Sequence, residues 1–236
     1  MISIIMPLYN GVEFLKESVS SIVAQTFKNW ELLIVINGLP TIKSNEVIKI
    51  INTFKDSRIK IIKTNKRGKI KALNKGVYLA KNNIIALIDV DDLWESTKLE
   101  KQLPLLEKYD VVGCDVEYFD EHTGSPNLFL GKLIKPMFIW QNPLINSMVM
   151  FKKQNAWWDE SWEGLDDYNL WIYLLNKNKT FYNVPEILGK HRIHKNSFFN
   201  NKNSKQNKEL KLKIGNLTEE EIKILEDIID NKRWLE

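Results

Sequence analysis

Three aspartates within four residues are the clearest sign of chemistry in this sequence. Asp89, Asp91 and Asp92 follow directly on the apolar run at residues 84–88. Like charges a few ångströms apart disfavour joint ionisation, so the cluster needs a compensating charge. Mg²⁺ or Mn²⁺ would supply it, because hard cations prefer carboxylate oxygens and keep positions open for phosphate oxygens. The alternative is an acidic cap on the following helix, which accounts for one aspartate and not for three.

A second acidic pair, Asp166 and Asp167, lies at the predicted start of a helix among aromatic residues. Aromatic rings can stack on the apolar faces of sugars, and a carboxylate beside an acceptor hydroxyl can act as a general base. Helix capping by Asp166 with aromatic core packing is the simpler interpretation, and these residues alone slightly favour it. The aromatic residues are Trp157, Trp158, Trp162, Tyr168 and Trp171.

Other ways of binding phosphate or metal are not supported. No glycines have the spacing of the G-x-G-x-x-G dinucleotide motif. Gly131-Lys132 does not complete a Walker loop, because Leu133 stands where Ser or Thr would bind magnesium. His191 and His194 are not in an HExxH frame, which argues against a zinc hydrolase.

An α/β fold is expected to position these residues. Strand-like runs alternate with helical patterns through the first half, which is typical of βαβ units and a mostly parallel sheet. Ligands of such sheets bind at the carboxyl ends of the strands. Tyr9-Asn10, Asn37 and the aspartates 89–92 are all expected there.

Periodicity and turn residues predict the individual elements. Strands are expected at residues 3–7, 31–36, 58–63, 84–88, 111–119 and 180–184. Helices are expected at residues 12–23, 44–54, 69–79, 98–106, 166–175 and 219–229. We expect Ser44 to cap the second helix, Thr218 and Glu221 to form a capping box on the last, and residues 196–207 to form a polar loop.

The composition fits one globular domain. The chain has 236 residues, of which 44% are hydrophobic and 27% charged. The single Cys114 excludes an intramolecular disulfide, and no apolar run approaches the ~20 residues of a membrane span, so we expect a cytoplasmic protein. A net charge of +4 does not support nucleic-acid binding. The lysine excess at 190–213 is expected to be solvated, with a site for an anionic membrane surface or an acidic substrate as the alternative.

Six segments together resemble the family 2 inverting glycosyltransferases of the GT-A fold. The resemblance covers most of residues 2–197 and keeps the order of the family's motifs. The segments are IIMPLYN at 4–10, SSIVAQT at 20–26, GKIKALNKG at 68–76, IDVDDLW at 88–94, DDYNLW at 166–171 and HRIHKNS at 191–197. It implies a Rossmann-like central sheet flanked by helices, with a more irregular acceptor side toward the C-terminus.

The resemblance also implies a role for each site residue. Asp167 corresponds to the family's catalytic base, preceded by Asp166 where glutamate is common. Asp91, Asp92 and His194 would hold Mn²⁺ or Mg²⁺ against the donor diphosphate. The residues implied in nucleotide or sugar binding are Pro7, Tyr9, Asn10, Asn37, Arg67, Asn74, Asp89 and Asp166.

These roles imply an in-line transfer of a sugar from a nucleotide-diphosphate donor, with UDP-sugars favoured, to a hydroxyl of a growing glycan. We expect residues 1–110 to form the donor-binding half of a single domain, 111–200 the acceptor and base half, and 201–236 a tail and helix. Ile36-Asn37 departs from the family, which usually has two aspartates there. A non-catalytic nucleotide-sugar or glycan-binding relative is therefore the alternative, and a glycoside hydrolase using paired carboxylates is a further one.

Overall fold

Strands and helices alternate through the first half of the chain, as predicted. The computed structural model describes residues 1–65, 67–162, 164–194 and 204–230. The elements begin with β1 (Ile2–Leu8), α1 (Leu15–Val23), β2 (Trp30–Asn37), α2 (Thr41–Phe54), β3 (Ile59–Thr64), α3 (Lys69–Leu79), β4 (Ile84–Leu87), β5 (Leu93–Trp94) and α4 (Lys98–Gln102). They continue with β6 (Val111–Asp120), β7 (Gly131–Leu133), α5 (Lys135–Trp140), β8 (Met150–Lys152), α6 (Asp166–Asn176), β9 (Phe181–Ile193), α7 (Ser204–Lys211) and α8 (Glu219–Asp230). Short 3₁₀ turns cover Val12–Phe14, Leu103–Glu107, Asn146–Met148, Lys153–Asn155 and Glu160–Trp162.

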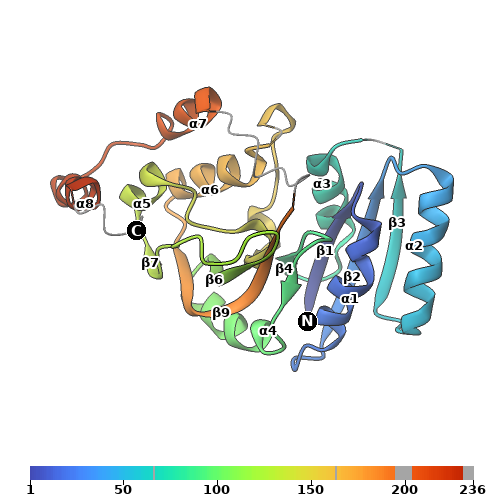
Figure 1. Ribbon diagram of the computed structural model, residues 1–236. Coiled ribbons are helices and arrows are strands. Elements are labelled where there is room, and N and C mark those ends of the chain that lie inside the picture. The colour runs from blue at the N-terminus through green and yellow to red at the C-terminus, as the bar shows by residue number, and fades with distance from the viewer. Residues whose placement is uncertain (66, 163, 195–203, 231–236) are drawn as a thin grey trace.

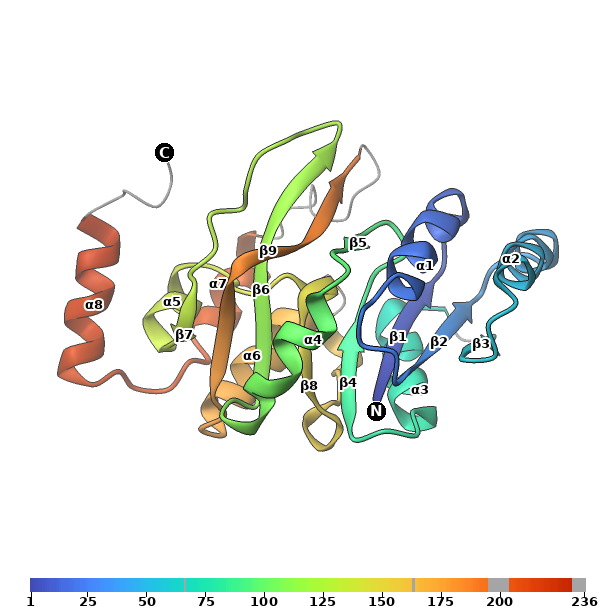
Figure 2. The same ribbon diagram turned by 90° about the horizontal axis from the view of Figure 1, so that it is seen from below.

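The described strands form one curled sheet in the order β3-β2-β1-β4-β8-β6-β9-β5, with β7 on β9. The long pairings are parallel, namely those among β1 to β4 and between β6 and β9. Strand β8 joins these two parallel parts by antiparallel pairing to β4 and β6. Figures 1 and 2 show helices on both faces of the sheet, which confirms the predicted α/β architecture with a mostly parallel sheet.

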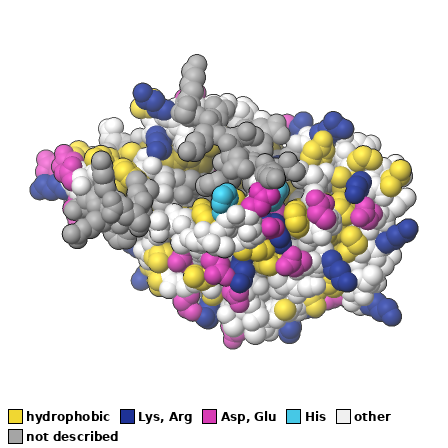
Figure 3. All heavy atoms as spheres, viewed as in Figure 1, with side chains coloured by type: hydrophobic (Ala, Val, Ile, Leu, Met, Phe, Trp, Pro, Cys, Tyr) yellow, Lys and Arg dark blue, Asp and Glu magenta, His cyan; other side chains and the backbone are white. Residues whose placement is uncertain are grey.

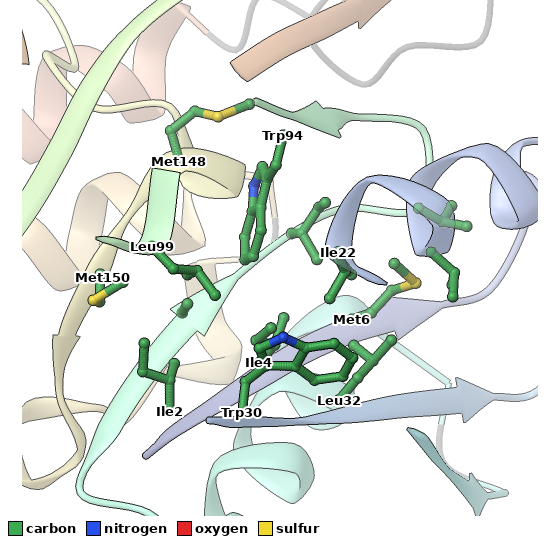
Figure 4. Packing of buried hydrophobic residues seen from close by; sticks show 14 of the residues in the cluster. Ile2, Ile4, Met6, Ile22, Trp30, Leu32, Trp94, Leu99, Met148 and Met150 are labelled. Carbon is green, nitrogen blue, oxygen red and sulfur yellow. The ribbon is translucent and has the colours of Figure 1, made fainter. Parts of the chain in front are cut away.

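The core lies on both faces of the sheet because the central strands are buried on both sides. In β1, Ile4 and Met6 pack on one face with α1 and α2, whereas Ile5 packs on the other face with α3. Figure 4 shows the first of these clusters, where Trp30 and Trp94 fill the space between strands and helices. Helix α3 lies so close to β1 that a Cβ at Gly76 would approach the Ile5 side chain to 2.5 Å.

Two predicted boundaries are wrong. Helix α2 begins at Thr41 after Pro40, so Ser44 lies inside its first turn and does not cap it. The strand predicted at 180–184 is the first part of β9, which continues to Ile193. Its pairing with β6 shifts register between Cys114 and Val116, where the partner residue moves from Val184 to Gly189. Pro185, which has no N–H to donate, lies in this irregularity, so the strand bulges there instead of ending.

The described residues 204–230 form two helices, α7 and α8. The predicted capping box is confirmed at the start of α8: the Thr218 N–H donates to Glu221 Oε2 at 2.8 Å, and the Glu221 N–H donates to Thr218 Oγ1 at 3.2 Å. Residues 195–203 lie outside the described part of the chain, and α7 begins at Ser204 where a polar loop is predicted. None of the described helices has the length and apolar composition to cross a bilayer.

Candidate active site

The polar residues predicted for chemistry meet at one edge of the sheet. Strands β1, β2 and β4 are parallel, so the residues after their carboxyl ends lie on the same side. Asp89 follows β4 by two residues, and its N–H donates to the Ser147 hydroxyl at 3.0 Å. Figure 3 shows histidine and acidic side chains gathered on this face of the molecule.

The first acidic pair is held by the end of β9. Asp92 is fully buried, and its carboxylate lies 3.0 Å from His191 Nδ1 and accepts the Arg192 N–H at 2.9 Å. Asp91 is partly exposed and lies 3.1 Å from His194 Nε2. The two neighbouring aspartates therefore differ: one faces into the fold and the other toward the edge of the sheet.

Arg192 fixes the backbone of the acidic loop. Its Nε donates to the Asp91 carbonyl at 2.9 Å, and its two Nη atoms form ion pairs with Glu17 at 2.6 Å and Asp120 at 2.7 Å. The guanidinium also lies over two phenylalanine rings. Strand β5 supports the same arrangement, because Leu93 pairs with Lys190 of β9. Helix α1, the end of β6 and the acidic loop are thus tied to one side chain.

Charge around the first pair is only partly balanced. Burial alone would raise the pKa of Asp92, but the charge of His191 and three hydrogen bonds lower it. Burial would likewise lower the pKa of His191, but Asp92 raises it to about 9. Burial, and then the charges of Asp92 and Asp89, raise the pKa of Asp91. Excess negative charge therefore remains at Asp91, where a cation would relieve it.

The second acidic pair begins α6. Asp166 is buried, and burial raises its pKa. Asp167 accepts the Asn142 amide at 3.1 Å and the Tyr168 N–H at 2.7 Å. Burial, and then the charge of Asp166, raise the pKa of Asp167 to about 6, against the opposing effect of Lys69. Asp167 is therefore ionised at neutral pH but more basic than an ordinary aspartate.

Lys69, at the start of α3, contacts Asp89 and acts through its charge on the second pair. Its Nζ forms an ion pair with Asp89 Oδ2 at 2.7 Å. Burial alone would lower the pKa of Lys69, but the charges of Asp89, Asp166 and Asp167 together raise it. The carboxylate that follows β4 and the pair that begins α6 therefore share one cation.

The residues predicted around the nucleotide are placed differently from one another. Tyr9 and Asn10 are exposed after β1, and the Arg67 guanidinium lies 5.8 Å from the centre of the Tyr9 ring. Pro7 is buried within β1, one residue before its end. Tyr9, Asn10 and Arg67, together with the partly exposed Asp89, are thus the members of the predicted nucleotide and sugar set that a ligand can reach.

Two predicted amides are used inside the fold. The Asn37 Nδ2 donates to the Gly68 carbonyl at 2.9 Å, and the Asn37 side chain is almost fully buried. Asn74 exchanges hydrogen bonds with the backbone of Trp158, donating at 2.9 Å and accepting at 3.0 Å. Both polar atoms of the Asn74 amide are therefore occupied, and they hold the Trp158 segment against α3.

The predicted aromatic surface also changes. Trp158, Tyr168 and Trp171 are core residues with at most 1% exposure, as the simpler interpretation of this region proposed. Trp162 lies under the Lys213 ammonium, 3.8 Å from its ring centre. Trp157 is 70% exposed.

Sequence reasoning missed several residues of the site. Asp92 is predicted as a metal ligand, but its oxygens are taken by His191 and Arg192, which leaves Asp91 as the accessible carboxylate. Lys69 and Asn142, the side-chain partners of Asp89 and Asp167, are also absent from the prediction. A lysine in the first turn of a helix is unfavourable for the helix dipole and could have been noticed; nothing in the sequence singles out Asn142.

Comparison with known proteins identifies the family of the chain. The model of the family described as Glycosyl transferase family 2 matches residues 3–199. The chain belongs to this family. Glycosyltransferase family 2 was the resemblance suggested by the six motifs, and that expectation is confirmed; the motif residues 195–197 lie outside the described part of the chain.

Relatives of this family 2 glycosyltransferase include proteins of known activity. The chain is 30% identical over 212 residues to WfgD of Escherichia coli, a UDP-Glc:alpha-D-GlcNAc-diphosphoundecaprenol beta-1,3-glucosyltransferase, covering 86% of this chain and 81% of WfgD. It is 31% identical over 206 residues to an uncharacterized glycosyltransferase of Methanocaldococcus jannaschii, covering 82% of this chain and 71% of that protein.

Solved structures agree on the fold. S. aureus TarS in complex with UDP superposes with a TM-score of 0.72 at 14% identity, covering 97% of this chain and 70% of that one. The mannosyltransferase PcManGT from Pyrobaculum calidifontis, in complex with GDP-Man and Mn²⁺, gives a TM-score of 0.66 at 17% identity, covering 84% and 58%. The GT-A fold is therefore confirmed for this glycosyltransferase.

Proposed function

We propose that this glycosyltransferase moves a sugar with inversion from a nucleoside-diphosphate sugar, a UDP-sugar being favoured, to a hydroxyl of a growing glycan. The observation that carries the proposal is the link between two acidic pairs at one edge of the sheet. Asp91 is accessible at the first pair, and Asp167 belongs to the second. Asp89, two residues before Asp91, forms a 2.7 Å ion pair with Lys69, whose charge also acts on Asp166 and Asp167.

The Asp91 site suits a hard divalent cation, Mn²⁺ or Mg²⁺. Its carboxylate carries uncompensated charge and lies 3.1 Å from His194, so these two groups would hold the ion. The described residues contain no group of three or more His, Cys, Asp or Glu side chains placed to bind a metal. Mg²⁺ commonly takes only one or two carboxylates and completes its shell with water and substrate phosphates. When bound, the ion would stabilise negative charge on the donor diphosphate.

Asp167 would act as the general base. It takes the proton of the acceptor hydroxyl, whose oxygen forms a bond to the anomeric carbon as the bond from that carbon to the diphosphate oxygen breaks. The nucleoside diphosphate leaves, and the configuration at the anomeric carbon is inverted. A pKa of about 6 suits this role, because the carboxylate is ionised at neutral pH and still basic. Asn142 orients it.

The exposed residues after β1 and before α3 would bind the nucleotide. Tyr9, Asn10 and Arg67 offer an aromatic ring, an amide and a guanidinium at this edge. Asn37 would act only from within the fold, because its side chain is almost fully buried and its Nδ2 donates to the Gly68 carbonyl. Asp89 would hold the ribose or the sugar. Pro7 and Asp166 are buried and would contribute to nucleotide or sugar binding only from within the fold.

The names of two relatives suggest the first substrates to test. WfgD and WfaP of Escherichia coli are both UDP-Glc:alpha-D-GlcNAc-diphosphoundecaprenol beta-1,3-glucosyltransferases. We would therefore assay UDP-glucose and UDP-N-acetylglucosamine as donors, with a GlcNAc-diphosphate lipid as acceptor. Comparing the two donors distinguishes hexosyl from N-acetylhexosaminyl transfer.

The test measures release of nucleoside diphosphate from a panel of nucleotide sugars with Mn²⁺, Mg²⁺ or EDTA. We expect cation-dependent release that Asp91→Ala abolishes, and an inverted anomeric centre in the product by NMR. If the donors raise the melting temperature but are never turned over with any acceptor, the non-catalytic alternative is correct. If no nucleotide sugar binds with either cation, both versions of the proposal fail.

A further inference from the structure

The ion pair between Lys69 and Asp89 relates the donor side of the site, where Asp89 lies, to the general base Asp167. Lys69 begins α3, and its Nζ lies 2.7 Å from Asp89 Oδ2, with both side chains only partly exposed. The same ammonium acts on Asp166 and Asp167 at the start of α6. The Lys69 ammonium therefore contacts the Asp89 carboxylate directly and interacts through its charge with the carboxylates of Asp166 and Asp167.

Lys69 does not stabilise helix α3 at its position in the first turn. The amino end of a helix carries partial positive charge, so a cation in the first turn is unfavourable, and α3 has no acidic residue in that turn. The preceding Gly68 has a φ of 117°, which glycine tolerates, and its carbonyl accepts the buried Asn37 amide at 2.9 Å. The chain thus fixes Lys69 at this position against helix preference.

We propose that Lys69 is a positioning residue of the transfer reaction, which holds Asp89 in place and keeps Asp167 in its proton-accepting form. The inference rests on the proposed function, because it assigns Lys69 an effect on the same base. The groups that act on Asp167 are the Asp166 carboxylate, the Lys69 ammonium and the neutral Asn142 amide, and Tyr168 follows it in α6. Lys69 is the one cation in this set.

The expected direction follows from Coulomb's law. A nearby cation favours an ionised carboxylate, and a nearby carboxylate disfavours it. Without Lys69, only the hydrogen bonds from the Tyr168 N–H and the Asn142 amide would oppose burial and the Asp166 charge, so the pKa of Asp167 would rise. Asp89 would at the same time lose the partner that fixes its side chain, which would weaken donor binding.

The chain offers a matched control two residues away. Lys71 lies on the same helix and has the same side-chain exposure as Lys69, 38%, but it pairs with Glu160 at 3.7 Å. Lys71→Met therefore removes an equal charge from α3 without touching Asp89. Lys69→Met removes the charge that matters, and Lys69→Arg restores it. Circular dichroism and melting temperature show whether each variant is folded.

The first measurement needs no substrate. Protein labelled with ¹³C at aspartate carboxyl groups is titrated by NMR, and the Asp167 signal is identified by its loss in Asp167→Asn. We expect Lys69→Met to raise the Asp167 pKa by roughly one unit, the low end of the effect of a close opposite charge. Lys69→Arg and Lys71→Met should leave it unchanged.

The second measurement is the pH profile of sugar transfer from the active donor. The acid limb of kcat should move to higher pH in Lys69→Met, with about a fivefold loss at pH 6 for a one-unit shift. The KM for the donor should also rise, and Lys69→Arg should recover both values. Lys71→Met should match the wild type.

The outcomes separate this inference from the proposed function. If Lys69→Met leaves the Asp167 pKa and the acid limb in place, or if Lys71→Met moves them equally, Lys69 is not the positioning residue. If the carboxyl titration shows the coupling but the wild type transfers no sugar from any donor, the proposed function fails and the role of Lys69 in transfer fails with it.

Discussion

The two acidic pairs of this glycosyltransferase have similar sequences and different surroundings. Asp91-Asp92 and Asp166-Asp167 each combine one deeply buried aspartate with a more accessible one. At the first pair, the buried Asp92 has its own cationic partner in His191. At the second pair, Asp166 has an oxygen with no hydrogen-bond partner among the described residues.

This difference sets the protonation of the buried members in opposite directions. The pKa of Asp92 is lowered because His191, Arg192 and Ser147 outweigh burial. The pKa of Asp166 is raised because burial outweighs the charge of Lys69, and the pKa of Asp167 is raised because burial and the Asp166 charge outweigh that same lysine. At the first pair Asp92 therefore keeps a permanent charge, and together with burial this charge raises the pKa of the neighbouring Asp91, where a bound cation would relieve the repulsion. The second pair is built to exchange a proton, which suits a general base.

The largest expected effect is the loss of the base. Asp167→Asn keeps the shape of the side chain and removes its ability to take a proton, so kcat should fall by roughly 10²–10⁴-fold while the melting temperature changes little. Asp166→Asn is the matched control, because it removes the neighbouring charge and leaves the base. Steady-state kinetics with the active donor measures both. Full transfer activity in Asp167→Asn would show that the second pair is not the proton-exchanging one.

The first pair should respond in stability. Asp92→Ala leaves His191 and the Arg192 N–H without their buried partner, so the free energy of unfolding should fall by roughly 3–5 kcal/mol, the usual cost of breaking a buried ion pair. Asp91→Asn, at the partly exposed neighbour, should lower it by less than about 1 kcal/mol while transfer is lost. Urea unfolding measures both variants. If both variants lost the same free energy of unfolding, Asp92 would not differ from Asp91 as the buried, structural member of the pair.

The positions of the two acidic pairs could be predicted from local sequence, but the contacts that make the pairs different could not. Strand ends locate Asp89 and Asp91, and the helix at Lys69–Leu79 is predicted with its observed bounds, because both signals lie within a short window of sequence. The N-terminal half follows this pattern because each strand and helix there alternates regularly. The parallel sheet then follows from the order of elements.

The partners of the aspartates are distant in sequence and therefore escaped prediction. His191 meets Asp92 only because β9 continues past Pro185, where a proline predicts that the strand ends. Lys69 meets Asp89 across twenty residues, and Asn142 meets Asp167 across twenty-five. Which of two adjacent aspartates points inward depends on these contacts, so the sequence alone assigns Asp92 to the metal as readily as Asp91.

The second pair should also set the pH dependence of the enzyme. With a pKa of about 6, Asp167 is protonated as the pH falls below that value, so kcat should drop about tenfold per pH unit on the acid side. The effect of Asp167 on stability has the opposite sign. Its pKa in the folded state lies above the unfolded value near 4, so as the pH falls the folded state binds the proton first. The free energy of unfolding contributed by Asp167 therefore increases as the pH falls from 6 to 4. Melting curves of the wild type and Asp167→Asn against pH measure this contribution. An acid limb near pH 4 would remove the difference between the pairs.

The smallest expected effect concerns the residue that departs from the family pattern. Asn37→Asp restores the usual carboxylate, but the buried Nδ2 that donates to the Gly68 carbonyl would become a second oxygen facing that carbonyl. Losing a buried donor costs roughly 1–3 kcal/mol of unfolding free energy, and kcat should not rise. Asn37→Ala is the control, because it removes the donor without adding charge. Because Gly68 precedes Lys69, a disturbed turn would also loosen the cation shared by the second pair, and the Asp167 pKa should rise slightly. If Asn37→Asp were more active and equally stable, the Asn37 side chain would not be needed to hold the Gly68 turn and, through it, Lys69.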